Sequence, residues 1–174
     1  MKNRVRRFYA VLCCTLLLVG CQSANTPQGV EVKVARVVSG QSFEVTGIGE
    51  KPQLISRVRL VGIDAPDLQQ QPWGVEAKQQ LEKMIGGGSV MLEFDVQDSD
   101  EFGRHLAYVW KDGVLLNEKL VAGGYVLSVP RSPNHKYDQR LSRAQEAARL
   151  MGQGIRNPDQ PMRLTPAEFR RQNR

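Results

Sequence analysis

The 174-residue sequence predicts an α+β, mainly β domain, a five-stranded barrel of the OB type with about three helices. Two observations predict this fold. Apolar and polar residues alternate over several short segments, as they do in half-buried strands, and a segment with helical spacing lies between the third and the fourth of them. Two further helical segments follow the last strand, which is the element order of a small Greek-key barrel with one open face.

The strands are expected where residues of alternating polarity are bounded by turn residues. In the first strand, Val30, Val32 and Val34 would share one face, and the turn at Ser39-Gly40 leads into the second. The strands are predicted over residues 30–38, 42–46, 54–61, 90–94 and 105–110, and an Asp112-Gly113 hairpin turn leads on to residues 114–116.

The helices are expected where apolar residues recur every three or four positions. The first, Trp73–Ile85, ends at a run of three glycines, which cannot continue a helix well. Asn117 is expected to cap a short second helix, Glu118–Ala122, because its side chain can accept a bond from the first turn. The third helix is expected over Tyr137–Met151.

Residues 1–20 have the pattern of a lipoprotein signal peptide, with a positive start and a short apolar run. Cys21 follows the run and is the expected lipidation site; an uncleaved anchor helix is the alternative. Residues 21–29 would be a flexible tether, residues 30–156 the OB-fold domain, and residues 157–174 a polar tail, disordered or forming a short surface helix. Because Gln22 is not aspartate, we expect an outer-membrane anchor facing the periplasm if the organism has two membranes.

Removing the signal peptide changes the cysteine count and the charge. Cys13 and Cys14 leave with it, and Cys21 carries lipid, so the mature chain has no thiol for a disulfide or a metal. Four of the 24 Lys and Arg lie in residues 1–20, which leaves 20 against 18 Asp and Glu, a net charge of +2. Nucleic-acid binding must therefore rest on a local site rather than on bulk charge.

Two segments could carry chemistry. Arg59 lies on a strand, and Asp64 and Asp67 follow where that strand ends, so two carboxylates could hold a hard cation or activate a water beside a phosphate-binding guanidinium. The alternative is a structural salt bridge. The second segment is Asp98–Arg104, and its alternative is an acidic surface turn in which Arg104 pairs with an aspartate.

Several segments together resemble the staphylococcal nuclease family. Their order and spacing match over residues 30–155, which makes the resemblance more specific than any one short motif. The segments are RVRLVGIDAPD (57–67), PWGVEAKQQLEKM (72–84), DSDEFGRHLAYVWKDGVLLNEKLVAGGY (98–125) and YDQRLSRAQEAAR (137–149).

The resemblance implies a calcium-dependent phosphodiesterase that cuts DNA and RNA, here expected to be monomeric. The family's two phosphate-binding arginines match Arg59 and Arg104. Its calcium-ligating aspartate matches Asp64, and the backbone carbonyl of Ala65 would be a second ligand. The glutamate that handles the attacking water falls at Asp67.

Three departures put turnover in doubt. Where the family has a second calcium-ligating aspartate, this chain has Gln41, a neutral ligand that lowers the expected calcium affinity. Asp67 is one methylene shorter than glutamate, and Phe102 keeps an aromatic ring for nucleotide contact but has no hydroxyl. Two functions therefore stay open: an exported, membrane-tethered, metal-dependent nuclease, or a weakened or non-catalytic module that binds nucleic acid or protein.

Overall fold

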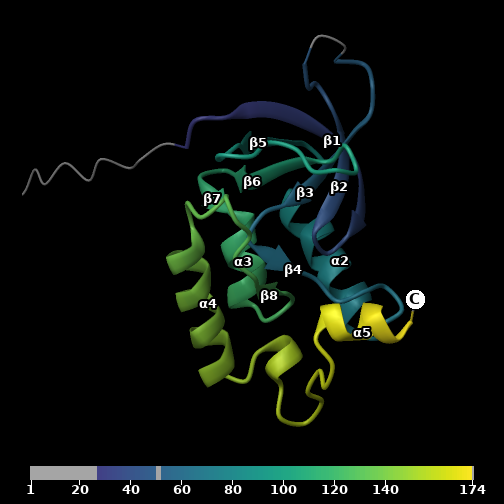
Figure 1. Cartoon of the computed structure of the whole chain (residues 1–174), viewed down its shortest axis with the longest axis vertical. Helices are drawn as coiled ribbons and strands as arrows, with labels where there is room; N and C mark the ends of the chain where they lie inside the picture. The colour runs from purple at the N-terminus through teal and green to yellow at the C-terminus, as the bar shows by residue number, and fades with distance from the viewer. Residues whose placement is uncertain (1–26, 50–51, 174) are drawn as a thin grey trace, which may run out of the picture.

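The computed structural model describes residues 27–49 and 52–173, and these form a β-barrel with helices packed at one end (Figure 1). The strand order in the main sheet is β3-β2-β1-β5-β6-β7, and a parallel pairing of β3 with β6 closes it. Five strands therefore form the barrel and β7 extends it, so the predicted mainly β, OB-type fold is confirmed.

The strands begin and end close to the predicted boundaries. Two short strands, β4 and β8, pair with each other outside the barrel and were not predicted, because two residues are too few to show a polarity pattern. The strands are β1 (Val30–Ser39), β2 (Ser42–Thr46), β3 (Ser56–Leu60), β4 (Ile63–Asp64), β5 (Ser89–Glu93), β6 (His105–Lys111), β7 (Val114–Leu115) and β8 (Leu127–Ser128).

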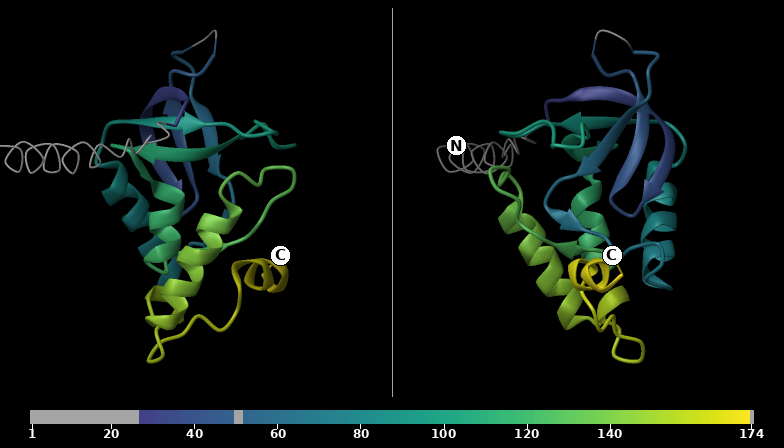
Figure 2. Two further views of the ribbon diagram at one scale, coloured as in Figure 1. Left: turned by 90° about the vertical axis from the view of Figure 1, so that its left-hand side faces the viewer. Right: turned by 45° about the vertical axis from the view of Figure 1, so that its right-hand side comes forward.

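Three helices match the predicted ones, α2 (Trp73–Ile85), α3 (Leu116–Ala122) and α4 (Asp138–Leu150), and they lie together at one end of the barrel (Figure 2). The role expected for Asn117 was wrong. Leu115 is the N-cap residue of α3, and Asn117 lies inside the helix with no solvent exposure. Its side chain is directed into the protein, where it bonds backbone groups of the barrel.

The core fills the barrel and the space between the barrel and the helices. Apolar side chains of β2, β3 and β5 alternate inward, the central residues of β6 are all buried, and α2, α3 and α4 each add one buried stripe. The stripe of α2 is Ala77, Leu81 and Ile85. Burial of this apolar surface is the main favourable contribution to folding. It also fixes the strand register that places the polar residues at the barrel's open side.

Of the two alternatives expected for residues 157–174, disorder or a short surface helix, the structure shows a short helix. A turn of 3-10 helix at Gly154–Arg156 is followed by helix α5 (Pro166–Gln172), which lies beside the chain that follows β4 (Figure 1). A capping box between Thr165 and Glu168 begins the helix, with Pro166 buried at its first position. The residues at its start thus favour a surface helix, and the contacts of Arg170 with Asp64 hold this helix against the barrel.

The signal peptide predicted at residues 1–20 and the lipidation predicted at Cys21 lie outside the described residues, as does most of the tether. None of the helices in the described ranges is long and apolar enough to cross a membrane.

Candidate active site

One cavity gathers most of the residues that the sequence singled out. It has a volume of about 670 Å³ and lies between the β1–β2 turn, the end of β3, the segment after β4 and helix α5. Four arginines line it, and we call it the arginine cavity. Its polar lining consists of Ser39, Gln41, Ser42, Arg59, Asp67, Gln69, Arg104, Arg131 and Arg170, with Ala65, Phe102 and three further apolar residues.

Arg59 lies at the base of the arginine cavity. Strand β3 runs parallel to β6 there, with Arg59 opposite Leu106, so the closure of the barrel fixes its position beside the residue that precedes β6. The residue is only 8% exposed, and it donates one hydrogen bond, from Nη2 to the Ile63 carbonyl at 3.3 Å. Its Nη2 is also 3.7 Å from Oδ1 of Asp64.

Burial lowers the pKa of Arg59 to about 10, and Asp64 opposes this shift. The other three guanidinium groups of the cavity contribute to this lowering of the pKa, because like charges disfavour one another. A buried cation with few hydrogen bonds and three cationic neighbours is electrostatically unfavourable by itself. It would be stabilised by an anion with several acceptor oxygens, such as a phosphate.

Arg104 stands across the cavity at the start of β6 and is held by Asp100. Its Nε and Nη2 donate to Oδ2 of Asp100 at 2.8 and 2.7 Å, and the Arg104 guanidinium lies 5.2 Å from the ring centre of Phe102. Burial raises the pKa of Asp100, but the hydrogen bonds and charge of Arg104, together with the hydrogen bond from the Phe102 amide, outweigh burial and leave the pKa below its ordinary value. The structure therefore shows the turn in which Arg104 pairs with an aspartate and places Arg104 on the cavity, while phosphate binding by Arg104 stays a prediction.

The loop after β4 brings Asp64 and Ala65 beside Gln41. The Gln41 side-chain oxygen accepts a hydrogen bond from the Ala65 amide at 2.6 Å, and the Gln41 carbonyl accepts one from Leu60 at 2.9 Å. Asp64 is 7% exposed and lies under the cavity, next to Arg59. Gln41 therefore fastens this loop to the β1–β2 turn.

Asp67 and Phe102 lie toward the mouth of the arginine cavity. Oδ1 of Asp67 accepts a hydrogen bond from the Gln69 amide at 2.9 Å, which orients the half-buried carboxylate. The Phe102 side chain is 72% exposed. The structure thus places Gln41, Arg59, Asp64, Ala65, Asp67, Phe102 and Arg104 around one site.

Comparison with known proteins agrees with the geometry. The family model described as "Staphylococcal nuclease homologue" matches residues 57–157, more than half of the chain. The chain belongs to the staphylococcal nuclease family. It is 34% identical to the thermonuclease of Staphylococcus hyicus over 71% of this chain and 73% of that one. It is 32% identical to the thermonuclease of Staphylococcus intermedius over 73% and 76%, and 33% identical to the endonuclease YncB of Bacillus subtilis over 72% and 64%.

Family membership raises the question of whether these residues fit a calcium ion. Asp64, Ala65 and Gln41 offer hard oxygen atoms, the type that calcium prefers. However, Nη2 of Arg170 lies 2.7 and 3.0 Å from the two oxygens of Asp64, and its Nη1 lies 3.5 Å from the Ala65 carbonyl. With α5 docked, the donor set carries one negative charge, already paired, and does not fit calcium. In the described ranges, no three His, Cys, Asp or Glu side chains form a metal-binding group.

The sequence did not indicate two of the four cavity arginines of this staphylococcal nuclease homologue, Arg131 and Arg170. Arg131 lies between two prolines in the loop after β8 and lines the cavity. Arg170 comes from α5, beyond the part of the chain that resembles the family. The signal for α5 was present in the sequence as the spacing of Thr165 and Glu168. Nothing local to Arg170 indicated that it would lie against Asp64.

Replacing Gly40 by alanine should disturb the site of this family member through packing. A Cβ at Gly40 would lie 2.5 Å from the Cβ of Ala77 in α2 and 3.1 Å from that of Ala65. The β1–β2 turn would have to move away, taking Gln41 with it. We expect the free energy of unfolding to fall by about 1–3 kcal/mol, measured by urea denaturation.

Gly88→Ala is the matched control, because a Cβ there would meet only the flexible end of Lys111, at 3.3 Å. A Gly40 variant no less stable than the Gly88 variant would contradict the packing argument.

Proposed function

We propose that this protein is a nuclease that hydrolyses phosphodiester bonds of DNA or RNA in the arginine cavity. The observation that carries the proposal is the meeting of Arg59, Arg104 and Asp67 around one cavity in a chain of the staphylococcal nuclease family. Two guanidinium groups suit a phosphate and a carboxylate suits a water molecule, so the residues needed for hydrolysis face the same space.

The charges explain how the cavity would promote the reaction. Attack on a phosphodiester builds negative charge on its nonbridging oxygens, and cations held in place beforehand lower that barrier. Arg59 is fixed by β3 and by burial, and Arg104 is fixed by its hydrogen bonds to Asp100. Neither side chain must be ordered when substrate binds. This lowers the entropic cost of reaching the transition state.

Asp67 is proposed to orient the attacking water or accept its proton. Its carboxylate is half-buried at the cavity wall, and the Gln69 amide holds one of its oxygens. Phe102 is proposed to contact a base, because its exposed ring stands over the mouth near Arg104. These roles require a single strand, or the end of a duplex, to pass over the cavity mouth.

The test is cleavage of plasmid DNA and of single-stranded DNA and RNA by the full-length chain, purified in mild detergent. Each substrate is tested with millimolar Ca²⁺ and with EDTA. The comparison is a double variant, Arg59→Ala with Arg104→Ala, which we expect to cleave at least a hundredfold more slowly. Equal cleavage by the two proteins in both conditions would exclude this cavity as the active site.

The second candidate is a module that binds nucleic acid without cutting it. Two observations favour it. The side-chain oxygen of Gln41 already accepts a hydrogen bond from the Ala65 amide, and both oxygens of Asp64 are paired with Arg170. Retention of labelled single-stranded DNA by a protein that cleaves no substrate in either condition would support this candidate over the nuclease. The metal dependence of cleavage stays a prediction that the EDTA arm tests.

We also propose that the chain acts outside the cytoplasm as a monomer tethered to a membrane by lipid on Cys21, at the outer membrane in an organism with two membranes. The pattern of residues 1–21 supports this proposal. Mass spectrometry of the amino-terminal peptide tests the lipid, and detection of the unmodified Met1 peptide in membrane fractions would contradict it. Sedimentation of the detergent-solubilised protein tests the monomer.

A further inference from the structure

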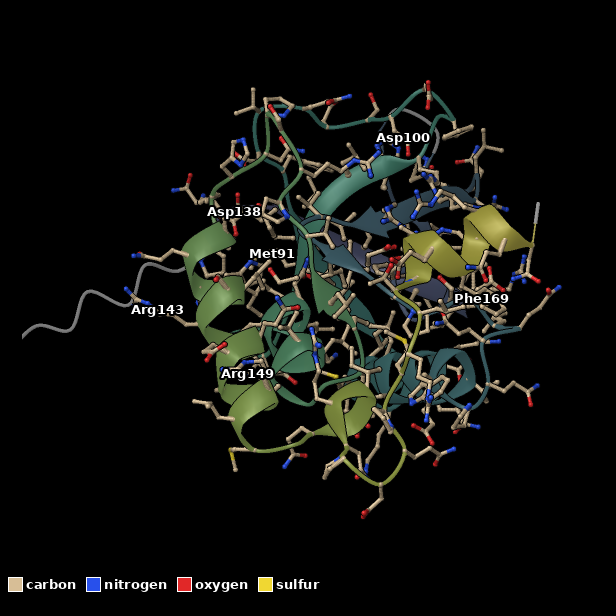
Figure 3. The ribbon with its side chains drawn as sticks, turned by 60° about the horizontal axis from the view of Figure 1, so that its bottom comes forward. Met91, Asp100, Asp138, Arg143, Arg149 and Phe169 are labelled. Atoms are coloured by element: carbon tan, nitrogen blue, oxygen red, sulfur yellow. The ribbon has the colours of Figure 1, made fainter. Side chains whose placement is uncertain are left out.

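Helix α5 is anchored directly over the residues expected to bind a cation. The capping box at Thr165 begins it, and Nε2 of Gln70, a buried side chain, donates to the Leu164 carbonyl at 2.7 Å. Gln70 belongs to the same loop as Asp64 and Asp67. In Figure 3, α5 and its Phe169 lie on the same side of the barrel as Asp100, which holds Arg104. The helix is thus a wall of the arginine cavity.

Arg170 is the residue that α5 delivers to the site. Its Nη2 lies within hydrogen-bonding distance of both oxygens of Asp64, and its Nη1 is near the Ala65 carbonyl. These are two of the three groups that the family resemblance assigns to calcium, the third being Gln41. A guanidinium group therefore sits at the position where a metal ion was expected.

The negative charge of Asp64 is already more than compensated without an added ion. Asp64 carries one negative charge, Gln41 is neutral, and Arg170 supplies one positive charge at 2.7 Å. Arg59 adds a second cation 3.7 Å from the same carboxylate. A divalent ion at this position would meet two guanidinium groups and one carboxylate, so it would be repelled more than attracted.

Arg170 also keeps capacity for a ligand. A guanidinium group has five N–H donors in a rigid plane, and the contacts with Asp64 and Ala65 involve only its two terminal nitrogens. The side chain is 36% exposed and lines the arginine cavity together with Arg59, Arg104 and Arg131. Its hydrogen bonds to Asp64 hold the guanidinium group in one orientation, as outer carboxylates orient the ligands of metal sites.

We propose that Arg170 is a phosphate-binding residue that takes the place of the metal, so that the cavity binds a nucleotide phosphate without a divalent cation. The proposal rests on the proposed function, because it concerns the same phosphate site. It assigns to the carboxy-terminal segment a part in the site that the matched domain, residues 57–157, does not contain.

The experiment is calorimetric titration of the full-length chain, in detergent, with thymidine 3′,5′-bisphosphate, once with EDTA and once with Ca²⁺. The variants are Arg170→Gln, Arg59→Met and the control Arg171→Gln, which removes the same charge from an exposed position of the same helix. We expect the natural chain to bind equally well in both conditions. With EDTA, Arg170→Gln should bind at least tenfold more weakly, and Arg171→Gln should bind within about twofold of the natural chain.

Each other outcome has a distinct meaning. Binding by the natural chain only with Ca²⁺ would overturn the proposal, as would equal affinities of the Arg170 and Arg171 variants. Tighter binding by Arg170→Gln in Ca²⁺ would also overturn it, because α5 would then be a competitor of the metal. If the natural chain binds the bisphosphate in neither condition, or if Arg59→Met binds it as tightly as the natural chain does, the proposed function itself fails.

Discussion

Replacing Arg59 by methionine should lower the rate of phosphodiester cleavage about a hundredfold, which corresponds to about 3 kcal/mol of transition-state stabilisation. The guanidinium group is buried at the base of the arginine cavity and makes one hydrogen bond within the protein, to Ile63. Its remaining donors are available to a phosphate. Methionine fills a similar volume but offers no donor and no charge.

The same substitution should leave the fold as stable as before or more stable. Burial and three neighbouring guanidinium groups hold the pKa of Arg59 below its ordinary value, so at neutral pH its charge costs folding free energy. Asp64 would not be left unpaired, because Arg170 still contacts both of its oxygens. A charged residue that lowers stability at the base of a cavity is expected to have a role in binding a ligand.

The measurements are kcat on a single-stranded oligonucleotide and the midpoint of thermal unfolding. Arg57→Met is the matched control, because Arg57 lies two residues away on β3, has a side chain that is 54% exposed and pairs with Glu44. We expect the control to keep its rate within about threefold. If the Arg59 variant unfolded at a midpoint several degrees lower but kept the kcat of the natural chain, Arg59 would have a structural role only.

The barrel could be predicted because its signals are local. Alternating polarity in β1 and β3, glycines after α2 and the Asp112-Gly113 turn each act within a few residues. Burial confirms the inward face of β3, whereas on the predicted face of β1 Val32 is buried and Val30 is exposed. One feature of β1, a β-bulge, could not be predicted from the alternating polarity. A bulge between Val34 and Arg36 moves the inward positions of β1, so that Val37 is buried.

The site could be predicted only as far as the family resemblance reached. Arg59 and Arg104 are far apart in sequence, and the parallel pairing of β3 with β6 places them on the same cavity. Arg170 is 106 residues from Asp64, and the contact between them depends on where α5 docks. A sequence shows that α5 can form, but its docking is decided by tertiary contacts such as the one from Gln70.

Asn117 shows how a correct residue can receive the wrong role, and it carries the largest expected effect on stability. Its side-chain oxygen accepts from the Val109 amide at 2.9 Å, and its Nδ2 donates to the Val61 carbonyl at 2.8 Å. It thereby joins β6 to the residue that follows β3. The side chain is completely buried, so no water can replace either bond.

Asn117→Ala should therefore lower the free energy of unfolding by about 2–6 kcal/mol, because two buried backbone groups lose their partners at about 1–3 kcal/mol each. Urea denaturation measures the change. Asn117→Leu separates hydrogen bonding from packing: it keeps the volume and loses both bonds, and it should be nearly as damaging. Asn157→Ala is the control, since Asn157 also bonds a backbone amide, that of Asp159, but at an exposed position.

The control should lose less than about 1 kcal/mol, because water can hydrogen-bond the exposed amide once the side chain is removed. If Asn117→Ala were no worse than Asn157→Ala, the buried bridge would contribute little to the fold. Val61 follows β3 by one residue, and Arg59 lies on that strand. A loosened bridge should therefore also lower the cleavage rate, even though Asn117 does not line the arginine cavity.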